Sequence, residues 1–285
     1  MSEQDALVRR LRAAGCVFAE EEAALVLEQA ALVAPADRAA EVDRMATARE
    51  AGLPLEQVLG WAELAGVRVA VEPGVFVPRR RTGLMVAEAV ARGSAVGGDR
   101  AVVLLDLCCG SGAVAAAVGH GLRAAGVEVE TTAADLDPVA VRCARANLPG
   151  ARVLVSDLFD AVPDDLRGRV DVLTANVPYV PTEALGLMPR EAREHEPRLS
   201  LDGGADGLAV LRRVAALAPG WLAPGGTLLV ETSEAQEPTA RAVLAEAGLD
   251  PEVRRDDDLG AVVVLGIRGR TRPDVRPGPD GRLVG

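Results

Sequence analysis

Short apolar runs alternate with longer amphipathic stretches over most of the chain. From Thr82 onward this pattern predicts a helix near 83–92 and strands near 102–107, 129–134, 152–156, 170–175, 226–231, 251–256 and 261–267. Strands that alternate with helices are typical of a mostly parallel sheet. The link between the last two strands is too short for a parallel crossover, so we expect those two strands to be antiparallel.

The first part of the chain has a different pattern. Between residues 2 and about 60, apolar residues recur at helical spacing, with acidic and arginine residues between them, which predicts a small helical domain. Val67–Val71 and Val75–Val77 then alternate around Pro73 and Gly74, which predicts a β-hairpin. The predicted division is a helical domain at 1–62, a β-hairpin linker at 63–82, an α/β domain at 83–268 and a disordered tail, rich in Arg, Pro and Gly, at 269–285.

Composition narrows the class of protein. Almost half of the 285 residues are apolar, which is enough for a substantial core, and the net charge is −11. Direct binding to nucleic acid or to an anionic membrane depends on a basic surface, so neither is expected. No stretch approaches a membrane-spanning length, and the acidic start Met1–Asp5 lacks the apolar region of a signal peptide. We therefore expect a cytoplasmic protein, and a monomer.

The cysteines do not form a recognisable framework. Cys108 and Cys109 are adjacent, Cys16 and Cys143 are distant from them, and the chain has only two histidines. Without a Cys-x-x-Cys pair a zinc site is not expected, and we predict no metal. The two adjacent cysteines are interpreted as small residues in a tight turn, with a redox role as the weaker alternative.

The segment Asp106–Gly112 carries the first chemical signal. It places Gly110 and Gly112 between a buried strand and an Ala-rich helix start, which is the context of a nucleotide-binding loop. The next strand ends at Asp135, where an acid can accept hydrogen bonds from ribose hydroxyls. The glycines also match a looser dinucleotide pattern, so a nicotinamide enzyme is an alternative. However, the Asp106 carboxylate would repel a pyrophosphate and suits the ammonium of S-adenosylmethionine (SAM).

The second signal is the tetrapeptide Asn176-Val177-Pro178-Tyr179, which follows the predicted strand 170–175. Ligands of open α/β sheets bind outside the carboxyl ends of the strands. Proline restricts the residue before it, so the Asn176 amide oxygen and the Val177 carbonyl are expected to point in one fixed direction. These two acceptors, with Tyr179 as an aromatic wall, would hold a planar group that carries an –NH2. Alone, the tetrapeptide is more readily interpreted as an ordinary turn.

The two signals together predict methyl transfer to nitrogen. Two acceptors that hold both N–H groups of an amide would direct its developing lone pair at the methyl and stabilise the positive charge that grows on nitrogen. No strong base is required. His195 is more readily interpreted as structural than as a base, and the run Glu20–Glu22 as a solvated helix face.

From about Leu53 to Gly266 the chain resembles the HemK/PrmC family, whose members methylate a glutamine side-chain amide in class I release factors. The resemblance rests on a collinear set of segments: Phe76-Val77-Pro78-Arg79, Asp106–Gly112, Asp135, Ser156–Phe159, Asn176–Tyr179, His195–Leu199 and Asp202–Leu208. It implies a Rossmann-like class I SAM-dependent methyltransferase fold with a seven-stranded, mostly parallel sheet and an N-terminal substrate-docking domain. It also implies a protein substrate and two groups of site residues. The catalytic group is Asn176, Val177, Pro178 and Tyr179, and the SAM-binding group is Asp106, Cys108, Cys109, Gly110, Ser111, Gly112, Asp135, Asp157, Leu158 and Asn176.

The chain departs from the family pattern in places. Val177 stands where the family has a proline, Cys108 and Cys109 replace a Gly and usually a Thr, and Arg80, Arg81 and Gly83 replace the usual Pro, Glu and Glu. These changes leave other acceptors open: a small-molecule amide or amine, or, with less support from the acidic composition, a nucleic-acid base. A SAM-binding module without catalysis would be expected to lose Asn176, which is present.

Overall fold

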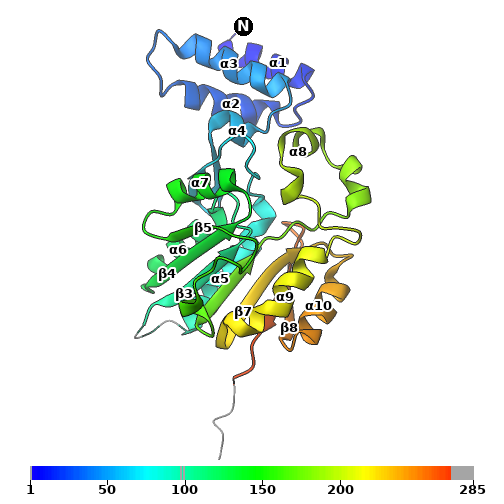
Figure 1. The fold of residues 1–285 in the computed structure, drawn as a ribbon. Coiled ribbons are helices and arrows are strands. Elements are labelled where there is room, and N and C mark those ends of the chain that lie inside the picture. The colour runs from blue at the N-terminus through cyan, green and yellow to red at the C-terminus, as the bar shows by residue number, and fades with distance from the viewer. Residues whose placement is uncertain (1, 97, 99, 271–285) are drawn as a thin grey trace, which may run out of the picture.

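A computed structural model describes residues 2–96, 98 and 100–270, and within these a seven-stranded sheet forms the centre of the protein (Figure 1). The strands are β3 (Val102–Leu107), β4 (Val129–Asp135), β5 (Arg152–Val155), β6 (Val170–Ala175), β7 (Leu222–Thr232), β8 (Asp250–Asp256) and β9 (Ala261–Ile267). Their order is β5-β4-β3-β6-β7-β9-β8, and only β9 runs antiparallel to its neighbours β7 and β8. The predicted strands and the antiparallel final pair are confirmed, and β7 begins a few residues earlier than expected.

Helices cover both faces of the sheet. One face carries α5 (Gly83–Val96), α6 (Ala113–Ala124) and α7 (Pro138–Asn147), and the other carries α9 (Ala209–Trp221) and α10 (Glu237–Glu246). The central strand β3 is buried along its whole length: Val102 and Leu104 pack on the first face, Val103 and Leu105 on the second. Burial on both faces explains why β3 has a continuous apolar run rather than an alternating one.

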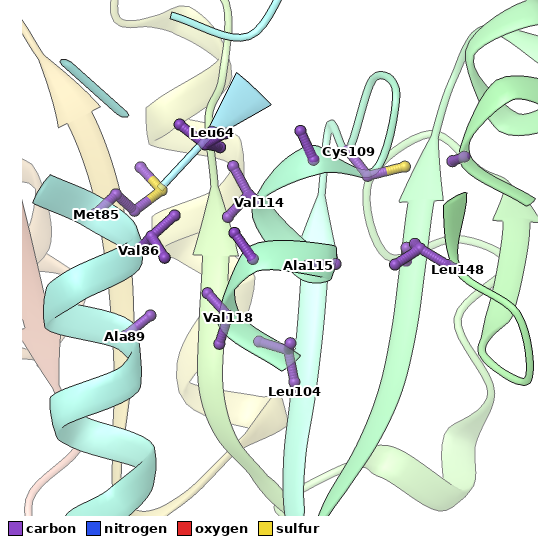
Figure 2. Packing of buried hydrophobic residues seen from close by; sticks show 14 of the residues in the cluster. Leu64, Met85, Val86, Ala89, Leu104, Cys109, Val114, Ala115, Val118 and Leu148 are labelled. Carbon is purple, nitrogen blue, oxygen red and sulfur yellow. The ribbon is translucent and has the colours of Figure 1, made fainter. Parts of the chain in front are cut away.

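Helices α5 and α6 pack closely on the first face. Figure 2 shows Met85 and Ala89 of α5 beside Val114 and Val118 of α6, above Leu104 of the sheet. A Cβ at Gly121 would lie 2.6 Å from a methyl carbon of Val90, so the approach of the two helices requires glycine there. This packing fixes the start of α6, and with it the loop that follows β3.

The N-terminal helices form a separate layer at the top of Figure 1. They are α1 (Glu3–Ala13), α2 (Ala19–Ala30), α3 (Arg38–Glu50) and the short α4 (Leu55–Leu59), and they share a core of their own. The expectation that Glu20–Glu22 is a solvated face is wrong for Glu22. Its side chain is buried and pairs with buried Arg49 at 2.8 Å, because α3 packs against this part of α2.

The β-hairpin lies earlier in the chain than predicted. It consists of β1 (Trp61–Leu64) and β2 (Val67–Ala70), which pair through a turn at Ala65 and Gly66. Both turn residues have positive φ, 48° and 78°, as a two-residue hairpin turn of the primed type requires. The hairpin predicted around Pro73 and Gly74 is therefore wrong. Alanine is uncommon at positive φ, so the sequence gives little sign of a turn at Ala65. The predicted boundary at residue 62 falls within β1, and the division into domains stays a prediction.

A segment between β6 and α9, which we name the flap (residues 182–200), connects the two layers. It contains the 3-10 turns η3 (Thr182–Leu187) and η4 (Arg198–Ser200) and the helix α8 (Arg190–His195), which lies below the N-terminal helices in Figure 1. Arg49 of α3 donates to Glu191 of α8 at 2.9 Å. Two further 3-10 turns are η1 (Arg80–Thr82), before α5, and η2 (Asp164–Leu166). Of the predicted tail, residues 271–285 lie outside the described residues.

Among the described residues, no helix has both the length and the apolar composition needed to cross a lipid bilayer. In the same residues, no group of three or more His, Cys, Asp or Glu side chains is arranged to hold a metal ion. All four cysteines are free thiols.

Candidate active site

A cleft opens at the carboxyl ends of β3, β4, β5 and β6, where parallel α/β sheets bind their ligands. Its empty space, including the part open to solvent, is about 990 Å³. The predicted site residues that line it are Cys108, Cys109, Gly110, Ser111, Asp135, Asp157, Leu158, Asn176 and Pro178. Four other predicted residues, Asp106, Gly112, Val177 and Tyr179, are not part of the lining. Thr82 and flap residues Leu199 and Ser200 complete the opposite wall.

The loop after β3 owes its shape to the main chain. Cys108, Gly110 and Gly112 have φ of 54°, 55° and 78°, and the Gly112 N–H donates to the Cys109 carbonyl at 2.7 Å. A side chain in this left-handed region costs about 1–2 kcal/mol, so Cys108 holds the conformation under strain. Burial raises the pKa of the Cys108 and Cys109 thiols, which keeps both neutral and favours their interpretation as small turn residues.

Asp135 supports this loop and faces the cleft at the same time. One carboxylate oxygen accepts from the Gly110 N–H at 2.8 Å and the other from the Asp137 N–H at 2.9 Å. Burial raises the pKa of Asp135, against the effect of these two N–H groups. Because each carboxylate oxygen has two lone pairs, Asp135 retains capacity to accept from ligand hydroxyls.

Asp106 lies beneath the loop rather than in the cleft wall. Its side chain is buried in β3, where one oxygen accepts from the Thr174 hydroxyl at 2.7 Å and the other has no partner among the described residues. Burial raises the pKa of Asp106 to about 7, and the Thr174 hydroxyl opposes that shift. An unpaired buried oxygen is compatible with a cationic ligand nearby, and the predicted role towards an ammonium stays a prediction.

The turn after β5 forms the side of the cleft predicted for the adenine. Leu158 has a φ of 51°, and the Ser156 hydroxyl donates to its carbonyl at 2.9 Å while accepting from the Ala161 N–H. The Asp157 carboxylate pairs with Arg213 of α9 at 2.9 Å. Ser156 therefore holds the apolar Leu158 side chain in the cleft wall, where a flat ring could pack.

The two predicted acceptors have no hydrogen-bond partner among the described residues. Asn176 is half-buried in the cleft wall, and no described residue forms a hydrogen bond with its side-chain amide. The carbonyl of Val177 likewise receives no N–H from the described residues, while the Val177 side chain is buried in the core. The Asn176 amide is therefore available to an incoming N–H group, whereas Val177 is buried and does not line the cleft, so the acceptor role of its carbonyl stays a prediction.

Tyr179 is held away from the cleft. Its hydroxyl donates to Glu231 Oε1 at 2.9 Å and accepts from Arg81 Nη2 at 2.6 Å, and its carbonyl accepts from Gln236 Nε2 at 2.8 Å. Burial, followed by the charge of Glu231, raises the pKa of this phenol, so it stays neutral. The structure thus places Tyr179 behind the two acceptors rather than over them, where the sequence had suggested an aromatic wall.

Two glycines of the segment Asp202–Leu208, Gly203 and Gly207, pack closely against the Asn176–Tyr179 motif. A Cβ at Gly203 would lie 2.7 Å from the Pro178 carbonyl, and one at Gly207 would lie 2.2 Å from the Tyr179 carbonyl. Gly207 also has a φ of 77°. The segment therefore packs its main chain directly against the Asn176–Tyr179 motif, and only glycine permits that approach.

His195 and Glu196 have structural positions. His195 does not line the cleft, and its Nε2 lies beside Gly52 of the N-terminal layer with no hydrogen-bond partner among the described residues. Glu196 is buried and binds Arg79 and, at 3.4 Å, the Val77 N–H. These contacts favour the structural interpretation of His195 and show the flap held against the linker.

Sequence analysis missed Glu231 and Gln236, which anchor Tyr179. One signal for Glu231 was available, namely an acidic residue that directly continues the apolar run Leu228–Val230 of a central strand. A charge in such a run is almost always paired.

Comparison of the sequence with known proteins finds methyltransferases as relatives. No protein-family model matches the chain. It is 38% identical over 223 residues to the release factor glutamine methyltransferase of Bordetella pertussis, covering 77% of this chain and 78% of that protein. The enzyme of the same name from Geobacter sulfurreducens is 35% identical over 219 residues, covering 75% and 73%. A 4-amino-L-phenylalanine/4-methylamino-L-phenylalanine methyltransferase of Streptomyces pristinaespiralis is 36% identical over 199 residues, covering 68% and 66%.

Solved structures agree at the level of the fold. A methyltransferase from Pyrococcus furiosus superposes with a TM-score of 0.52 at 15% identity, covering 82% of this chain and 99% of that one. A T. thermophilus 16S rRNA methyltransferase in complex with AdoMet and guanosine has a TM-score of 0.50 at 20% identity, covering 73% and 49%. The chain is a class I SAM-dependent methyltransferase, as defined by its sheet order, the glycine loop after β3 and the acid Asp135 at the end of β4. Within that class the chain belongs to the release factor glutamine methyltransferase family.

Proposed function

We propose that the protein transfers a methyl group from SAM to the side-chain amide nitrogen of a glutamine in a class I peptide chain release factor. The observation that carries the proposal is the Asn176 side-chain amide, which lines the cleft beside the cofactor loop and has no hydrogen-bond partner among the described residues; the Val177 carbonyl, directly after it, is unpaired as well. The names of the relatives from B. pertussis and G. sulfurreducens support the choice of substrate.

The residues present fit the cofactor, which supplies an electrophilic methyl group when bound. Asp135 would accept from the ribose hydroxyls, Leu158 would pack against the adenine, and the unpaired oxygen of buried Asp106 would favour the ammonium. Asn176 and Val177 would accept the two amide N–H groups and hold both hydrogens off the line of attack. An amide nitrogen is a weak nucleophile, so orientation and stabilisation of its growing positive charge are the main contributions of the protein.

The direct test is to incubate the enzyme with a purified release factor and SAM and to analyse the peptides by mass. We expect a gain of one methyl group on a single glutamine, and far slower methylation of that glutamine with Asn176→Ala. An enzyme that binds SAM but leaves every glutamine unmodified would contradict the proposal. Size-exclusion chromatography of the same enzyme preparation tests the further expectation that the protein is a monomer. Cell fractionation tests the expectation that the protein is cytoplasmic.

A small-molecule amine is the second candidate acceptor. The relative from S. pristinaespiralis is named for methylation of an aromatic amine, and Arg80 and Arg81 change the charge at the junction between linker and cleft. Incubation of a cell extract with methyl-labelled SAM, followed by mass identification of the labelled species, separates the two acceptors. Nucleic acid is the least favoured, because the chain has a net charge of −11.

A further inference from the structure

The side chains of Arg81, Tyr179 and Glu231 form a closed ring of hydrogen bonds at the end of the Asn176–Tyr179 motif. Arg81 donates from Nη2 to the Tyr179 hydroxyl at 2.6 Å and from Nε to Glu231 Oε1 at 2.9 Å, and Tyr179 donates to the same Glu231 oxygen at 2.9 Å. The three residues come from η1, from the motif after β6 and from β7. The ring therefore joins parts of the chain that are distant in sequence.

Glu231 makes the ring dependent on Arg81. Its side chain is 1% exposed, and its second oxygen has no partner among the described residues. A buried carboxylate is strongly unfavourable unless it is paired and hydrogen-bonded. Arg81 is the only cationic partner of Glu231 among the described residues, so its removal would leave a buried charge shared with the Tyr179 hydroxyl alone.

The ring is connected to the methyl acceptor site through Tyr179. The hydroxyl of Tyr179 is fixed by the ring, and its carbonyl is fixed by Gln236 Nε2 at 2.8 Å. With both ends anchored, the short stretch back to Asn176 has little freedom to turn. We infer that Arg81 is a positioning residue, which acts through Tyr179 and Glu231 to aim the two acceptors at the substrate amide; this role rests on the proposed function.

The neighbours of Arg81 extend the connection to the rest of the site. Thr82 lines the cofactor cleft, and Arg79 holds Glu196 of the flap at 2.6 Å. In this structure a carboxylate at position 81 would face buried Glu231. We therefore expect Arg81→Glu to harm turnover more than Arg81→Met.

The first experiment needs no acceptor. Tyr179 is the single tyrosine of the chain, so incorporation of 3-fluorotyrosine gives one ¹⁹F NMR signal from the ring itself. Arg81→Met and Glu231→Gln should each shift or broaden that signal. Arg80→Met is the matched control, because the side chain of exposed Arg80 has no hydrogen-bond or ion-pair partner among the described residues, and it should leave the signal unchanged. An unchanged signal in Arg81→Met would overturn the inference.

The second experiment measures turnover on the release factor. Arg81→Met should lower kcat by at least about tenfold, in line with the loss of an aligned acceptor, while the SAM dissociation constant stays within about twofold because the cofactor loop is untouched. Tyr179→Phe should lower kcat in the wild type and have little further effect in Arg81→Met, since both act through one ring. Arg81→Lys, which keeps the charge, should recover part of the loss.

The outcomes separate the two proposals. If the wild type methylates no release factor, the proposed function fails, and the ¹⁹F signal still decides whether Arg81 fixes Tyr179. If the wild type is active and Arg81→Met turns over equally fast, or if its defect is wholly additive with that of Tyr179→Phe, the positioning role fails. Should Arg81→Met not fold, the comparison of Arg81→Lys with Arg80→Met carries the test in the same way.

Discussion

Two segments at the same edge of the sheet are held by different means. The cofactor loop after β3 is held by main-chain hydrogen bonds and by the side chains of Asp135, which lies 25 residues from Gly110, and Asn147, which lies 36 residues from Ser111. The acceptor motif after β6 is held by side chains of Glu231, Gln236 and Arg81, which lie 52, 57 and 98 residues from Tyr179. The first segment is a local structure, and the second is assembled by the whole fold.

This difference explains which substitutions each segment tolerates. The loop accommodates Cys108 and Cys109, because the backbone path rather than the side chains sets its shape. The motif depends instead on the identity of distant side chains. We therefore expect changes in the loop to act mainly on cofactor affinity, and changes in the motif to act mainly on turnover.

Asn176→Ala should have the largest effect. It removes one of two acceptors for the substrate –NH2 and should lower kcat by about 10²–10³, as does the loss of one aligned partner of a developing charge. The SAM dissociation constant should change far less, because Asp135 and the loop remain. Single-turnover rates and calorimetric SAM binding measure the two quantities. Asn176→Asp, which keeps acceptor oxygens, should lose less, and undiminished turnover in Asn176→Ala would mean that the motif is only a turn.

Asp135→Ala should show the opposite pattern, with a loss of SAM affinity of about 1.5–3 kcal/mol, the range for a hydrogen bond to a charged group. The loss combines the ribose contact with the support that Asp135 gives to the Gly110 N–H. Calorimetry with SAM gives the value, and Asp160→Ala, an exposed acid outside the loop, serves as the control. Equal SAM affinity in the two variants would contradict the role of Asp135.

The same contrast separates what could be predicted from the sequence. The central strands β3 and β6 were predictable because each is a short apolar run that is buried along its whole length. The hairpin was misplaced because its turn has an alanine at positive φ, which local propensity disfavours. Glu22 was taken as exposed because its partner Arg49 is 27 residues away.

The candidate site divides in the same way. The loop, Asp135, Leu158 and Asn176 were predictable, because position at a strand end implies position at the cleft. The place of Tyr179 behind the acceptors was not, since it follows from three long-range contacts. Local patterns therefore identify the groups at the cleft, whereas the contacts that orient them require the fold.

A smaller effect is expected at Cys108, where the strained φ of 54° can be tested directly. Cys108→Gly should be more stable than Cys108→Ala by about 1 kcal/mol, because alanine keeps the left-handed strain and glycine relieves it, less the entropy that glycine loses on folding. Urea unfolding of both variants measures the difference. Equal stability would show that the loop relaxes to another conformation when the thiol is absent.

Val177→Pro should have the smallest effect and is the sharpest test of how the motif is held. The Val177 N–H has no hydrogen-bond partner among the described residues, so its loss removes no contact, and the carbonyl acceptor remains. Turnover should stay within about threefold of the wild type, which corresponds to about 0.6 kcal/mol. The measurement is kcat on the release factor, with the SAM dissociation constant as the internal control. If kcat fell while SAM affinity held, the N–H of Val177 would have to be paired during turnover, and the anchoring of Tyr179 would not be sufficient to orient the acceptors.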